Sequence, residues 1–506
     1  MMTLFGELFS NPYILATLVY LFALLGVGVY KSKVVNSSDD FMVAGRTLPW
    51  YILVGTLLAT WMGNGSLFGG AGLGYRNGLA SLWYSAGAWA GIVIVYFIAR
   101  RIRNFGQVTV PDIFEARYGK ASRVLATLIT VIAYLTIVSY QFKGGGRVIA
   151  IMTDGLITIE QGIMITAIFA ILYTVLAGML SVVYTDVVNG VLMTGGVLVG
   201  LGFLLYQVGG LDVVMNAAEE SGKWSVFGNW ADERENVNSG PIIAFSFLIP
   251  TMLLLLGDAN MYQRIFSAED SGQAQKAVFF WVIGVVILET SFQFFGLVGS
   301  VAVDQGLITN LFEEGRAGTE NIIPAAAGQA LPLVLGMVLV ATMMAVIVST
   351  ADSFLLVPAT NLTRDVWQRF VNPDLSEKNV VRLGRIFVLG LGLIAYLLVE
   401  QFPTILDAAY TAYLIYGAAI TPPLMAAFLW KRATWQGAVA SILVGSFTTL
   451  IWTFYLSSQP YFSSWSPFLQ EATYPAVLLS ILTLVGVSLA TPKPADEVWK
   501  PFFDNT

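Results

Sequence analysis

Long apolar runs, each about as long as a bilayer is thick, recur along this chain from one end to the other. A membrane-spanning helix needs about 20 predominantly apolar residues. Because backbone polar groups inside the bilayer must be satisfied within the segment, such runs predict helices. Thirteen segments qualify: residues 11–30, 49–74, 79–99, 122–152, 159–180, 185–208, 240–258, 277–302, 329–355, 384–401, 404–430, 435–457 and 474–491. The pattern predicts an all-α polytopic membrane protein with 13 transmembrane helices.

The composition supports this class and narrows the chemistry. The 506 residues are 56% hydrophobic and only 11% charged, whereas soluble proteins carry about 25% charged residues. The chain contains neither Cys nor His, which excludes disulfides and metal sites built from thiolate or imidazole. It also lacks a Gly-x-Ser-x-Gly elbow and a nucleotide-binding loop. We therefore expect a lipid-embedded protein that is not an enzyme and does not bind nucleic acid.

Basic residues predict the orientation of the chain. With the N-terminus outside and the C-terminus in the cytoplasm, all but six of the 26 Lys and Arg residues fall on the cytoplasmic side. The six exceptions are Arg76, Lys143, Arg147, Lys223, Arg234 and Arg316. Positively charged loops stay in the cytoplasm, so we predict a multi-pass protein of the plasma (inner) membrane in this orientation. Segment 104–121 is too polar to span and is expected to form a short helix at the cytoplasmic face.

Two of the predicted segments contain interruptions. The second has Gly-Asn-Gly-Ser at 63–66, which favours either close helix packing or local unwinding. Unwound backbone at membrane depth is tolerated only where it lines a cavity or is buried. The seventh is interrupted by Pro250 and Gly257 and ends in Asp258 and Asn260. Two broken helices five segments apart indicate a transporter with an inverted repeat, which binds solute and ion at the midplane.

This interpretation divides the chain into five parts. Residues 1–48 form an extra N-terminal helix and a cytoplasmic loop, and residues 49–208 form the first five-helix repeat. Residues 209–239 form an acidic extracellular loop, expected to be a solvated connector. Residues 240–430 form the second repeat, and residues 431–506 form two extra helices with a short cytoplasmic tail.

The ninth segment carries a polar cluster within an apolar helix: Ser349, Thr350, Asp352 and Ser353. Hydroxyls at this depth either bond back to their own helix or bind something else. Asp352 could belong to an inner gate or an ion path, but the favoured interpretation is a solvated carboxylate near the cytoplasmic face.

Several motifs, found in the expected order, resemble the sodium/solute symporter family. The stretch YTVLAGMLSVVYTDVVNG at 173–190 is similar to the family signature, with Ala177 where Gly is usual. NMYQRIFSAEDSGQAQKA at 260–277, and VSTADS followed by LTRDVW, match the stretches after segment 7 and in segment 9. The resemblance covers residues 10–490. It implies a 5+5 inverted-repeat core of the leucine-transporter type with extra helices at both ends.

The resemblance also implies symport with Na+ and a sodium site. In the family, carbonyls of the unwound second segment join carbonyl and hydroxyl groups of the ninth. The matching positions here are Ala59, Met62, Val346, Ser349 and Thr350. Some members have a second sodium site, which would implicate Asp186 and Ser353 in this chain. Asp186 could instead only cap the start of the sixth helix.

For the solute, the resemblance implies a cavity bounded by segments 2, 3, 7 and 11. The candidate contacts are Trp61, Ser66, Tyr84, Ser85, Asp258, Asn260 and Tyr413. The short side chains of Ser66, Ser85 and Ala88 argue against a hexose, which needs several fixed polar partners. Trp61 lies in an Ala-Thr-Trp run similar to that of the choline-transporter branch, where cation–π attraction holds an ammonium group. Asp258, however, stands where that branch has an aromatic residue.

Three further charges lie within predicted spans. Glu289 could contact the solute, carry a proton or pair with Lys143 or Arg147. These two cations could instead extend to the outer interface or contact an anionic solute. We expect sodium-coupled import of a small organic solute by alternating access. An amino-acid-like zwitterion or a small amine is favoured over a short monocarboxylate. The alternative function is that of a transporter-like membrane sensor.

Overall fold

The computed structural model describes residues 10–32, 42–228, 230, 233 and 239–503. Residues 33–41 of the predicted cytoplasmic loop and Arg234 of the outer loop lie outside these ranges. Within them, every regular element is a helix, apart from one isolated bridge between Leu48 and Ala268. Among the described residues, 11 helices are long and apolar enough to cross a membrane, and Pro12–Val27 and Trp50–Trp61 are shorter apolar helices. The all-α membrane class is therefore confirmed.

The helices follow the predicted segments closely. In the first half of the chain they are α2 (Pro12–Ser32), α4 (Trp50–Trp61), α5 (Ala71–Asn77), α6 (Leu82–Phe105), α7 (Val110–Tyr118), α8 (Lys120–Met152), α9 (Ile159–Gln207) and α10 (Leu211–Glu220). In the second half they are α11 (Gly240–Gly257), α12 (Ala259–Phe266), α13 (Ser271–Asp304), α14 (Gly315–Thr319), α15 (Ile322–Gln329), α16 (Leu333–Asn361), α17 (Glu377–Leu397), α18 (Ile405–Ala419), α19 (Thr421–Leu429), α20 (Trp435–Leu450), α21 (Pro467–Gln470), α22 (Thr473–Ala490) and α23 (Asp496–Trp499).

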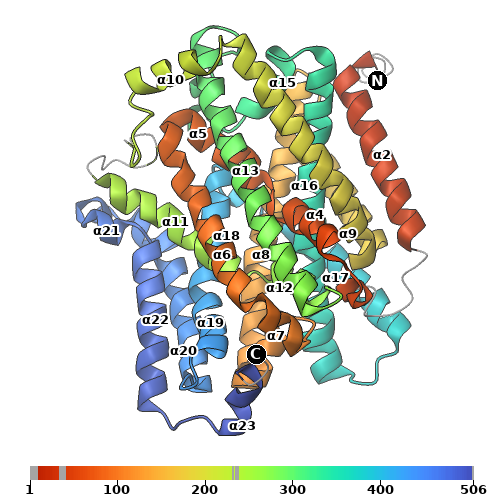
Figure 1. The fold of residues 1–506 in the computed structure, drawn as a ribbon, viewed down its shortest axis with the longest axis vertical. Helices are drawn as coiled ribbons and strands as arrows, with labels where there is room; N and C mark the ends of the chain where they lie inside the picture. Colours follow the sequence, from red (N-terminus) through yellow and green to blue (C-terminus); the bar gives the residue numbers. More distant parts are fainter. Residues whose placement is uncertain (1–9, 33–41, 229, 231–232, 234–238, 504–506) are drawn as a thin grey trace.

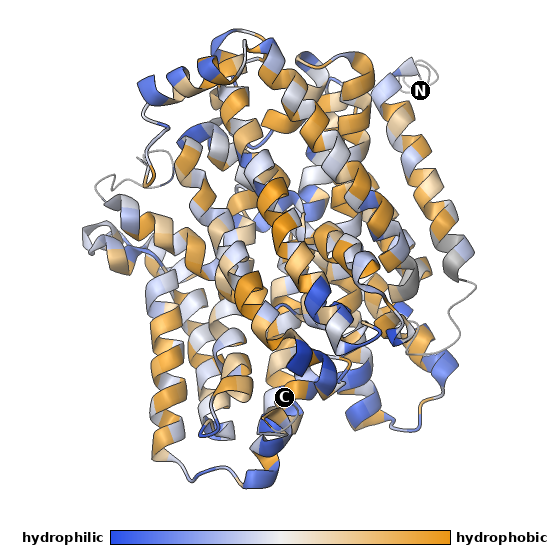
Figure 2. Cartoon of the chain, viewed as in Figure 1, coloured by the Kyte–Doolittle hydropathy of each residue, from blue (hydrophilic) through white to orange (hydrophobic). Residues whose placement is uncertain are grey.

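The long helices form one elongated bundle. The N-terminus and α10 lie at one end, and α7, α23 and the C-terminus lie at the other (Figure 1). Hydrophobic residues cover the sides of the bundle, whereas hydrophilic residues gather at the two ends (Figure 2). Exposed side chains on the peripheral helices are large and apolar, for example Leu389 on α17, Phe447 on α20 and Leu482 on α22. Such a surface suits lipid rather than water.

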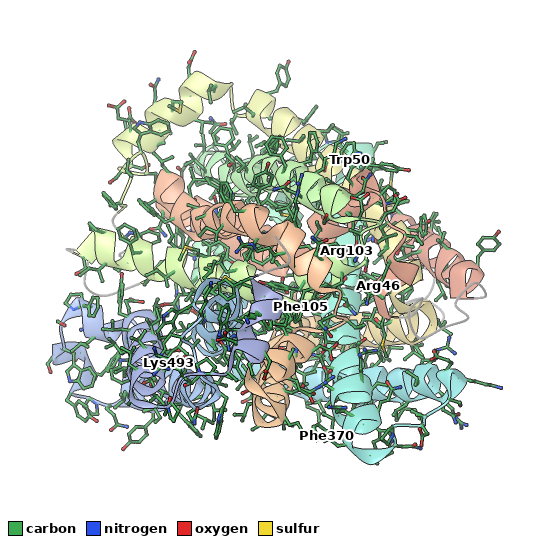
Figure 3. All side chains as sticks on the ribbon, turned by 60° about the horizontal axis from the view of Figure 1, so that its bottom comes forward. Arg46, Trp50, Arg103, Phe105, Phe370 and Lys493 are labelled. Atoms are coloured by element: carbon green, nitrogen blue, oxygen red, sulfur yellow. The ribbon has the colours of Figure 1, made fainter. Side chains whose placement is uncertain are left out.

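The end that carries the C-terminus is held together by basic residues. The predicted helix within 104–121 is confirmed as α7, which begins with a capping box between Thr109 and Asp112. Arg123 at the start of α8 forms ion pairs with Asp112 and Asp365. Figure 3 shows Arg46, Arg103 and Lys493 at this end of the molecule.

Both segments predicted to be interrupted contain a break in the helix. In the seventh segment the break lies after Gly257 and not at Pro250. Pro250 lies inside α11, which continues to Gly257. A helical proline has no N–H for the carbonyl four residues earlier, and that carbonyl, on Ser246, accepts a hydrogen bond from the Thr473 hydroxyl at 3.2 Å. The prediction that Pro250 interrupts the helix is therefore wrong, and the chain breaks at Asp258 (φ −57°, ψ 113°) before α12 begins.

The predicted turn between the fifth and sixth segments is not a helix boundary. One helix, α9, runs from Ile159 to Gln207, and its portions Ile159–Leu176 and Val182–Gln207 are each long enough to span. Thr158 caps its start. Asp186 lies in its interior, so the alternative that Asp186 caps a helix is wrong.

Candidate functional site

The break after α4 faces the polar cluster of α16. The Ser349 hydroxyl lies 3.1 Å from the carbonyl oxygen of Ala59 and 3.2 Å from that of Val346. The Thr350 hydroxyl lies 3.1 Å from the carbonyl oxygen of Met62 and 3.5 Å from that of Ala59. All five residues are buried. The five positions predicted to bind sodium thus form one cluster of neutral oxygens.

The helix break explains why these carbonyls are available. In a continuous helix, the N–H of Ser66 would bond the carbonyl of Met62. Here Met62 is extended (ψ 91°), and the N–H of Ser66 donates to the carbonyl of Gly63 at 3.1 Å instead. A carbonyl released at membrane depth needs another donor or a cation. The Thr350 hydroxyl supplies a donor, and the same oxygens suit a hard cation.

The break after α11 is closed differently. The Tyr416 hydroxyl donates to the carbonyl of Gly257 at 2.7 Å, and the Tyr262 hydroxyl donates to the carbonyl of Leu256 at 3.1 Å. Protein hydroxyls therefore satisfy the last carbonyls of α11. The cluster formed by the hydroxyls of Ser349 and Thr350 with backbone carbonyls therefore lies at the break after α4, not at the break after α11.

A second cluster surrounds Glu289 on α13. Its Oε1 accepts hydrogen bonds from Trp61 Nε1 at 2.8 Å and from Ser66 Oγ at 3.3 Å. Its Oε2 accepts from Trp89 Nε1 at 3.1 Å. Ser85, one turn before Trp89 on α6, is a further side-chain neighbour of this carboxyl. Both Trp61 and Ser66 come from the broken segment, so the break serves the carboxyl as well as the oxygen cluster.

Aromatic rings flank this carboxyl. The Tyr413 ring centre on α18 lies 5.8 Å from that of Trp61 and 6.3 Å from that of Tyr84. The Tyr140 hydroxyl lies 3.4 Å from that of Tyr413. A Cβ atom at Gly65 would lie 2.7 Å from the Tyr413 hydroxyl, so only glycine lets the broken segment approach this closely. Five predicted solute residues, Trp61, Ser66, Tyr84, Ser85 and Tyr413, are thus brought together.

The other two predicted solute residues form a separate group. Asp258 caps α12: its Oδ1 accepts the N–H of Asn260 at 2.8 Å and also the Tyr134 hydroxyl. The Asn260 carbonyl and side-chain oxygen lie 3.4 and 3.5 Å from Arg264 Nη1. The structure does not bring these two residues into the Glu289 cluster.

Arg264 lies at the place predicted for a second ion. Its Nη2 donates to Ser353 Oγ at 2.7 Å and to Asp186 Oδ2 at 3.2 Å, and the Thr56 hydroxyl donates to the same carboxyl oxygen at 2.6 Å. All four residues are buried. The guanidinium therefore shares the oxygens of both predicted second-site residues.

Asp352 belongs to this buried group. It is 1% exposed, and its Oδ1 accepts the Ser353 hydroxyl at 3.2 Å. The prediction of a solvated carboxylate is wrong, because α16 is packed against α4, α8 and α9 at this level. Asp352 Oδ2 and Asp186 Oδ1 have no hydrogen-bond donor within the described residues.

The cations of α8 do not pair with Glu289. Arg147 Nη1 lies 2.8 Å from Glu320 Oε2, and Lys143 Nζ donates to the carbonyl of Phe402 at 2.6 Å. Glu320 also accepts the N–H groups of Ile405 and Leu406 at the start of α18. The alternative in which Glu289 has either cation as its partner is wrong.

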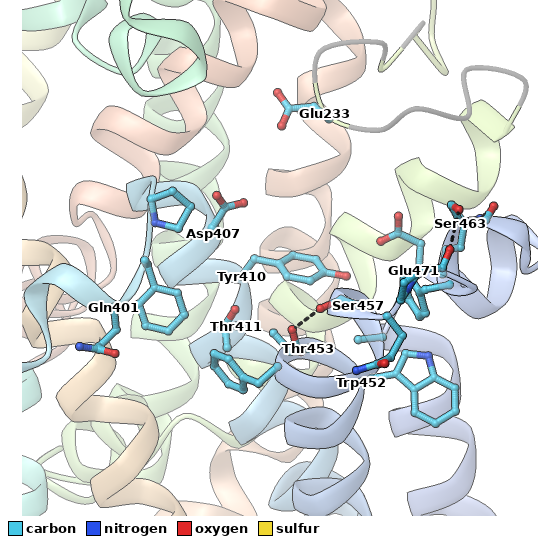
Figure 4. A pocket seen from close by; sticks show the side chains of 18 residues that line it. Glu233, Gln401, Asp407, Tyr410, Thr411, Trp452, Thr453, Ser457, Ser463 and Glu471 are labelled. Carbon is cyan, nitrogen blue, oxygen red and sulfur yellow. Dashed lines mark hydrogen bonds between the residues drawn. The ribbon is translucent and has the colours of Figure 1, made fainter.

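A cavity of about 660 Å³ opens beside the start of α18 (Figure 4). Its lining includes Glu233, Asp407, Tyr410 and Trp452. Arg316 bridges Glu233 and Asp407 at 3.0 and 3.4 Å. Glu233 is buried. The prediction that the whole outer loop is a solvated connector is therefore wrong. Tyr410 lies one turn from Tyr413, which places the cavity next to the Glu289 cluster.

Two residues with clear roles were missed in the sequence. Trp89 follows Ser85 by four residues, a spacing that places both on one helix face and could have identified it. Asn64 Nδ2 donates to the carbonyls of Tyr140 and Gln141 on α8 at 3.1 and 3.0 Å. That contact depends on how the broken segment docks, and no sequence pattern signals it.

A helical bundle with two discontinuous membrane helices has the architecture of a secondary transporter. The chain belongs to the sodium:solute symporter family, whose sequence model matches residues 41–445. It is therefore a multi-pass membrane symporter that couples a small organic solute to sodium.

Known proteins agree with this assignment. The chain is 26% identical to the osmoregulated proline transporter OpuE of Bacillus subtilis, over 97% of this chain and 98% of the relative. It is 24% identical to the sodium/proline symporter of Haemophilus influenzae, over 97% of each. Its fold is similar to that of a Na+-coupled sialic acid symporter in a substrate-bound outward-open state. The TM-score is 0.79 at 18% identity, covering 95% of this chain and 98% of that one. MhsT in complex with L-phenylalanine gives a TM-score of 0.53 at 17% identity, covering 87% and 98%.

Proposed function

We propose that the coupling sodium binds between α4 and α16. The carbonyls of Ala59, Met62 and Val346 and the hydroxyls of Ser349 and Thr350 are its ligands. The convergence of these five oxygens at a broken helix carries the proposal. Released backbone carbonyls are the usual sodium ligands of transporters with discontinuous helices. The chain's own hydroxyls hold the carbonyls in place when no ion is bound.

The same short segment links the ion to the solute. Carbonyls of Ala59 and Met62 face the proposed sodium site, whereas the side chains of Trp61 and Ser66 contact Glu289. Fixing the backbone on one side therefore fixes the indole and hydroxyl on the other. Such coupling requires that sodium favours one conformation over the other by differential affinity.

We infer that the solute is an amino-acid-like zwitterion or a small amine. Two of the relatives carry proline in their names, which supports a solute of this size and class. A short monocarboxylate is disfavoured because it would meet the carboxyl of Glu289. Asp258 and Asn260 would contact the solute only in a different conformation, one in which α12 has moved toward the Glu289 cluster.

We propose that the protein crosses the plasma membrane with 13 transmembrane helices. Its N-terminus then lies outside the cell and its C-terminus in the cytoplasm. The two chain ends lie at opposite ends of the bundle, as an odd number of spans requires (Figure 1). The cavity beside Tyr410 then opens to the outside and forms the entry route for the solute.

A second sodium bound by Asp186 and Ser353 stays a prediction. Two carboxyls, those of Asp186 and Asp352, lie in this group beside the one guanidinium of Arg264, and each has one carboxyl oxygen without a donor among the described residues. One further cation would complete this group.

Uptake by purified protein in liposomes tests the proposed function. At least one of radiolabelled L-proline and choline should accumulate, and only under an inward sodium gradient. Replacing Ser349 and Thr350 together by alanine should abolish the sodium dependence. Uptake that follows a proton gradient and ignores sodium would overturn the sodium assignment.

A further inference from the structure

Glu289 is a buried carboxyl that the protein does not pair with a cation. It is 1% exposed and lies near the middle of α13. Its hydrogen-bond donors, the indoles of Trp61 and Trp89 and the hydroxyl of Ser66, are all neutral. Among the described residues, no Lys or Arg forms an ion pair with it, whereas Asp186 and Glu320 each have an arginine within 3.2 and 2.8 Å.

A lone charge in such a place needs a counter-charge or a proton, because removing a carboxylate from water costs far more than neutral hydrogen bonds return. Intramembrane acids of this kind are functional by default. The donors of Glu289 come from the broken segment and from α6, so the carboxyl lies where these two elements meet α13.

The walls beside Glu289 suit an organic cation. The rings of Trp61, Tyr84 and Tyr413 lie together, with centres 5.8 and 6.3 Å apart. Aromatic faces attract ammonium groups, and the attraction is larger in a site without water. The combination of aromatic faces and an unpaired carboxyl distinguishes a cationic nitrogen from a neutral or anionic group of the same shape.

Building on the proposed function, we propose that Glu289 is the counter-charge for the cationic nitrogen of the transported solute. The solute class is that of organic ammonium compounds, from secondary amines to quaternary ammonium, with or without a carboxylate of their own. Trp61 and Tyr413 provide the aromatic faces, and Ser66 and Trp89 hold the carboxyl in position. Monocarboxylates and uncharged solutes are excluded.

Matched probes separate charge from shape. Choline and 3,3-dimethyl-1-butanol have the same shape, but only choline is charged, and glycine betaine adds a carboxylate. With L-proline and lactate they form a panel for isothermal titration of the full-length protein in saturating sodium. We expect at least one ammonium probe to bind, and the neutral alcohol and lactate to bind at least about 30-fold more weakly. That fold-change is typical for the loss of one partner of a buried charge pair. Equal binding of choline and its neutral analogue, or binding of lactate alone, would overturn the proposal.

Glu289→Gln distinguishes a counter-charge from a structural acceptor. Glutamine keeps one acceptor oxygen, which can still serve the Trp61 indole and the Ser66 hydroxyl, and loses the one that accepts from Trp89. It also removes the charge, so affinity for the ammonium probes should fall by about 30-fold or more. The control is Ser291→Ala on the same helix, because the Ser291 hydroxyl only bonds the carbonyl of Ile287. Unchanged affinity in Glu289→Gln would refute the proposal. If this variant does not fold, the probe panel on the unmodified protein decides alone.

Sodium binding without solute separates this inference from the function on which it rests. Sodium should raise the thermal stability of both the unmodified protein and Glu289→Gln, because the carboxyl is not among the proposed sodium ligands. Sodium stabilisation without any response to ammonium probes would refute only the role of Glu289. If sodium does not raise the thermal stability of the unmodified protein, the proposed sodium site itself is refuted.

Discussion

Replacing Thr350 by valine tests the proposed sodium site with little change in side-chain volume. The Thr350 hydroxyl lies 3.1 Å from the carbonyl oxygen of Met62 and donates to it. Valine leaves that carbonyl without this donor and takes one of five oxygens from the ion. The change in sodium affinity equals the free energy of the lost ion contact minus that of the lost hydrogen bond. The stability measured without sodium reports the lost hydrogen bond alone.

The expected size follows from the two contacts. A hydrogen-bonding group that faces a charge contributes about 1.5–3 kcal/mol, and a neutral hydrogen bond contributes about 0.5–1.5 kcal/mol. Their difference is about 1–1.5 kcal/mol, which corresponds to sodium binding that is about 5- to 12-fold weaker. The change lies in the sodium affinity because the ion gains less from the altered site than from the original one.

Thermal unfolding across a sodium titration measures this change, with potassium replacing sodium to keep the ionic strength constant. The matched control is Thr342→Val, on the same helix. The buried Thr342 hydroxyl donates to the carbonyl of Leu192 at 3.2 Å and lies about two turns of α16 before Thr350. Both variants should lower the unfolding temperature without sodium, but only Thr350→Val should shift the sodium midpoint. Equal midpoints in the two variants would refute the assignment of Thr350 as a ligand.

Three other predictions follow from close contacts between side chains. Asp186→Asn leaves its guanidinium partner with less counter-charge, so the free energy of unfolding should fall by about 3 kcal/mol or more in thermal or denaturant unfolding. Gly144→Ala places a Cβ atom onto the side chain of Asn64, so sodium-dependent uptake should fall, whereas Gly195→Ala, with open space around it, should leave uptake unchanged. Burial alone would raise the pKa of Glu115, but two arginines outweigh it and hold the pKa below 4.5. The ion pairs of Glu115 therefore stabilise the protein fully above pH 4.5, and this stabilisation is lost as the pH falls through the lowered pKa. In Glu115→Gln, the free energy of unfolding should no longer show this loss when it is measured against decreasing pH.

The proposed sodium ligands could be predicted from the sequence because both halves of the site leave local signals. Hydroxyls at Ser349 and Thr350 stand out in an apolar helix, and the glycines at 63 and 65 mark the break that releases carbonyls. The family resemblance then supplied the pairing of the two halves. Contacts between distant helices had no such signal. The indole of Trp89 reaches Glu289 only because α6 packs against α13.

The errors have the same origin. Asp352 was expected to be solvated because its segment turns polar, but burial depends on the neighbouring helices and not on the segment itself. Pro250 was expected to break its helix because proline lacks an N–H, but a hydroxyl from α22 takes the released carbonyl. In both cases a side chain far away in the sequence satisfies a polar group that local reasoning leaves exposed.

The two glycines of the broken segment explain why ion and solute can act on each other. A Cβ atom at Gly63 would lie 2.9 Å from the methyl group of Thr350, and one at Gly65 would lie 2.7 Å from the Tyr413 hydroxyl. Larger residues at either position would push the backbone away from the proposed sodium ligands or from the aromatic wall. The segment is therefore in direct contact with both sites over a few residues. A change of backbone on the side of the proposed sodium site cannot be absorbed before it reaches Trp61, because Trp61 lies between Ala59 and Met62, whose carbonyls are proposed sodium ligands.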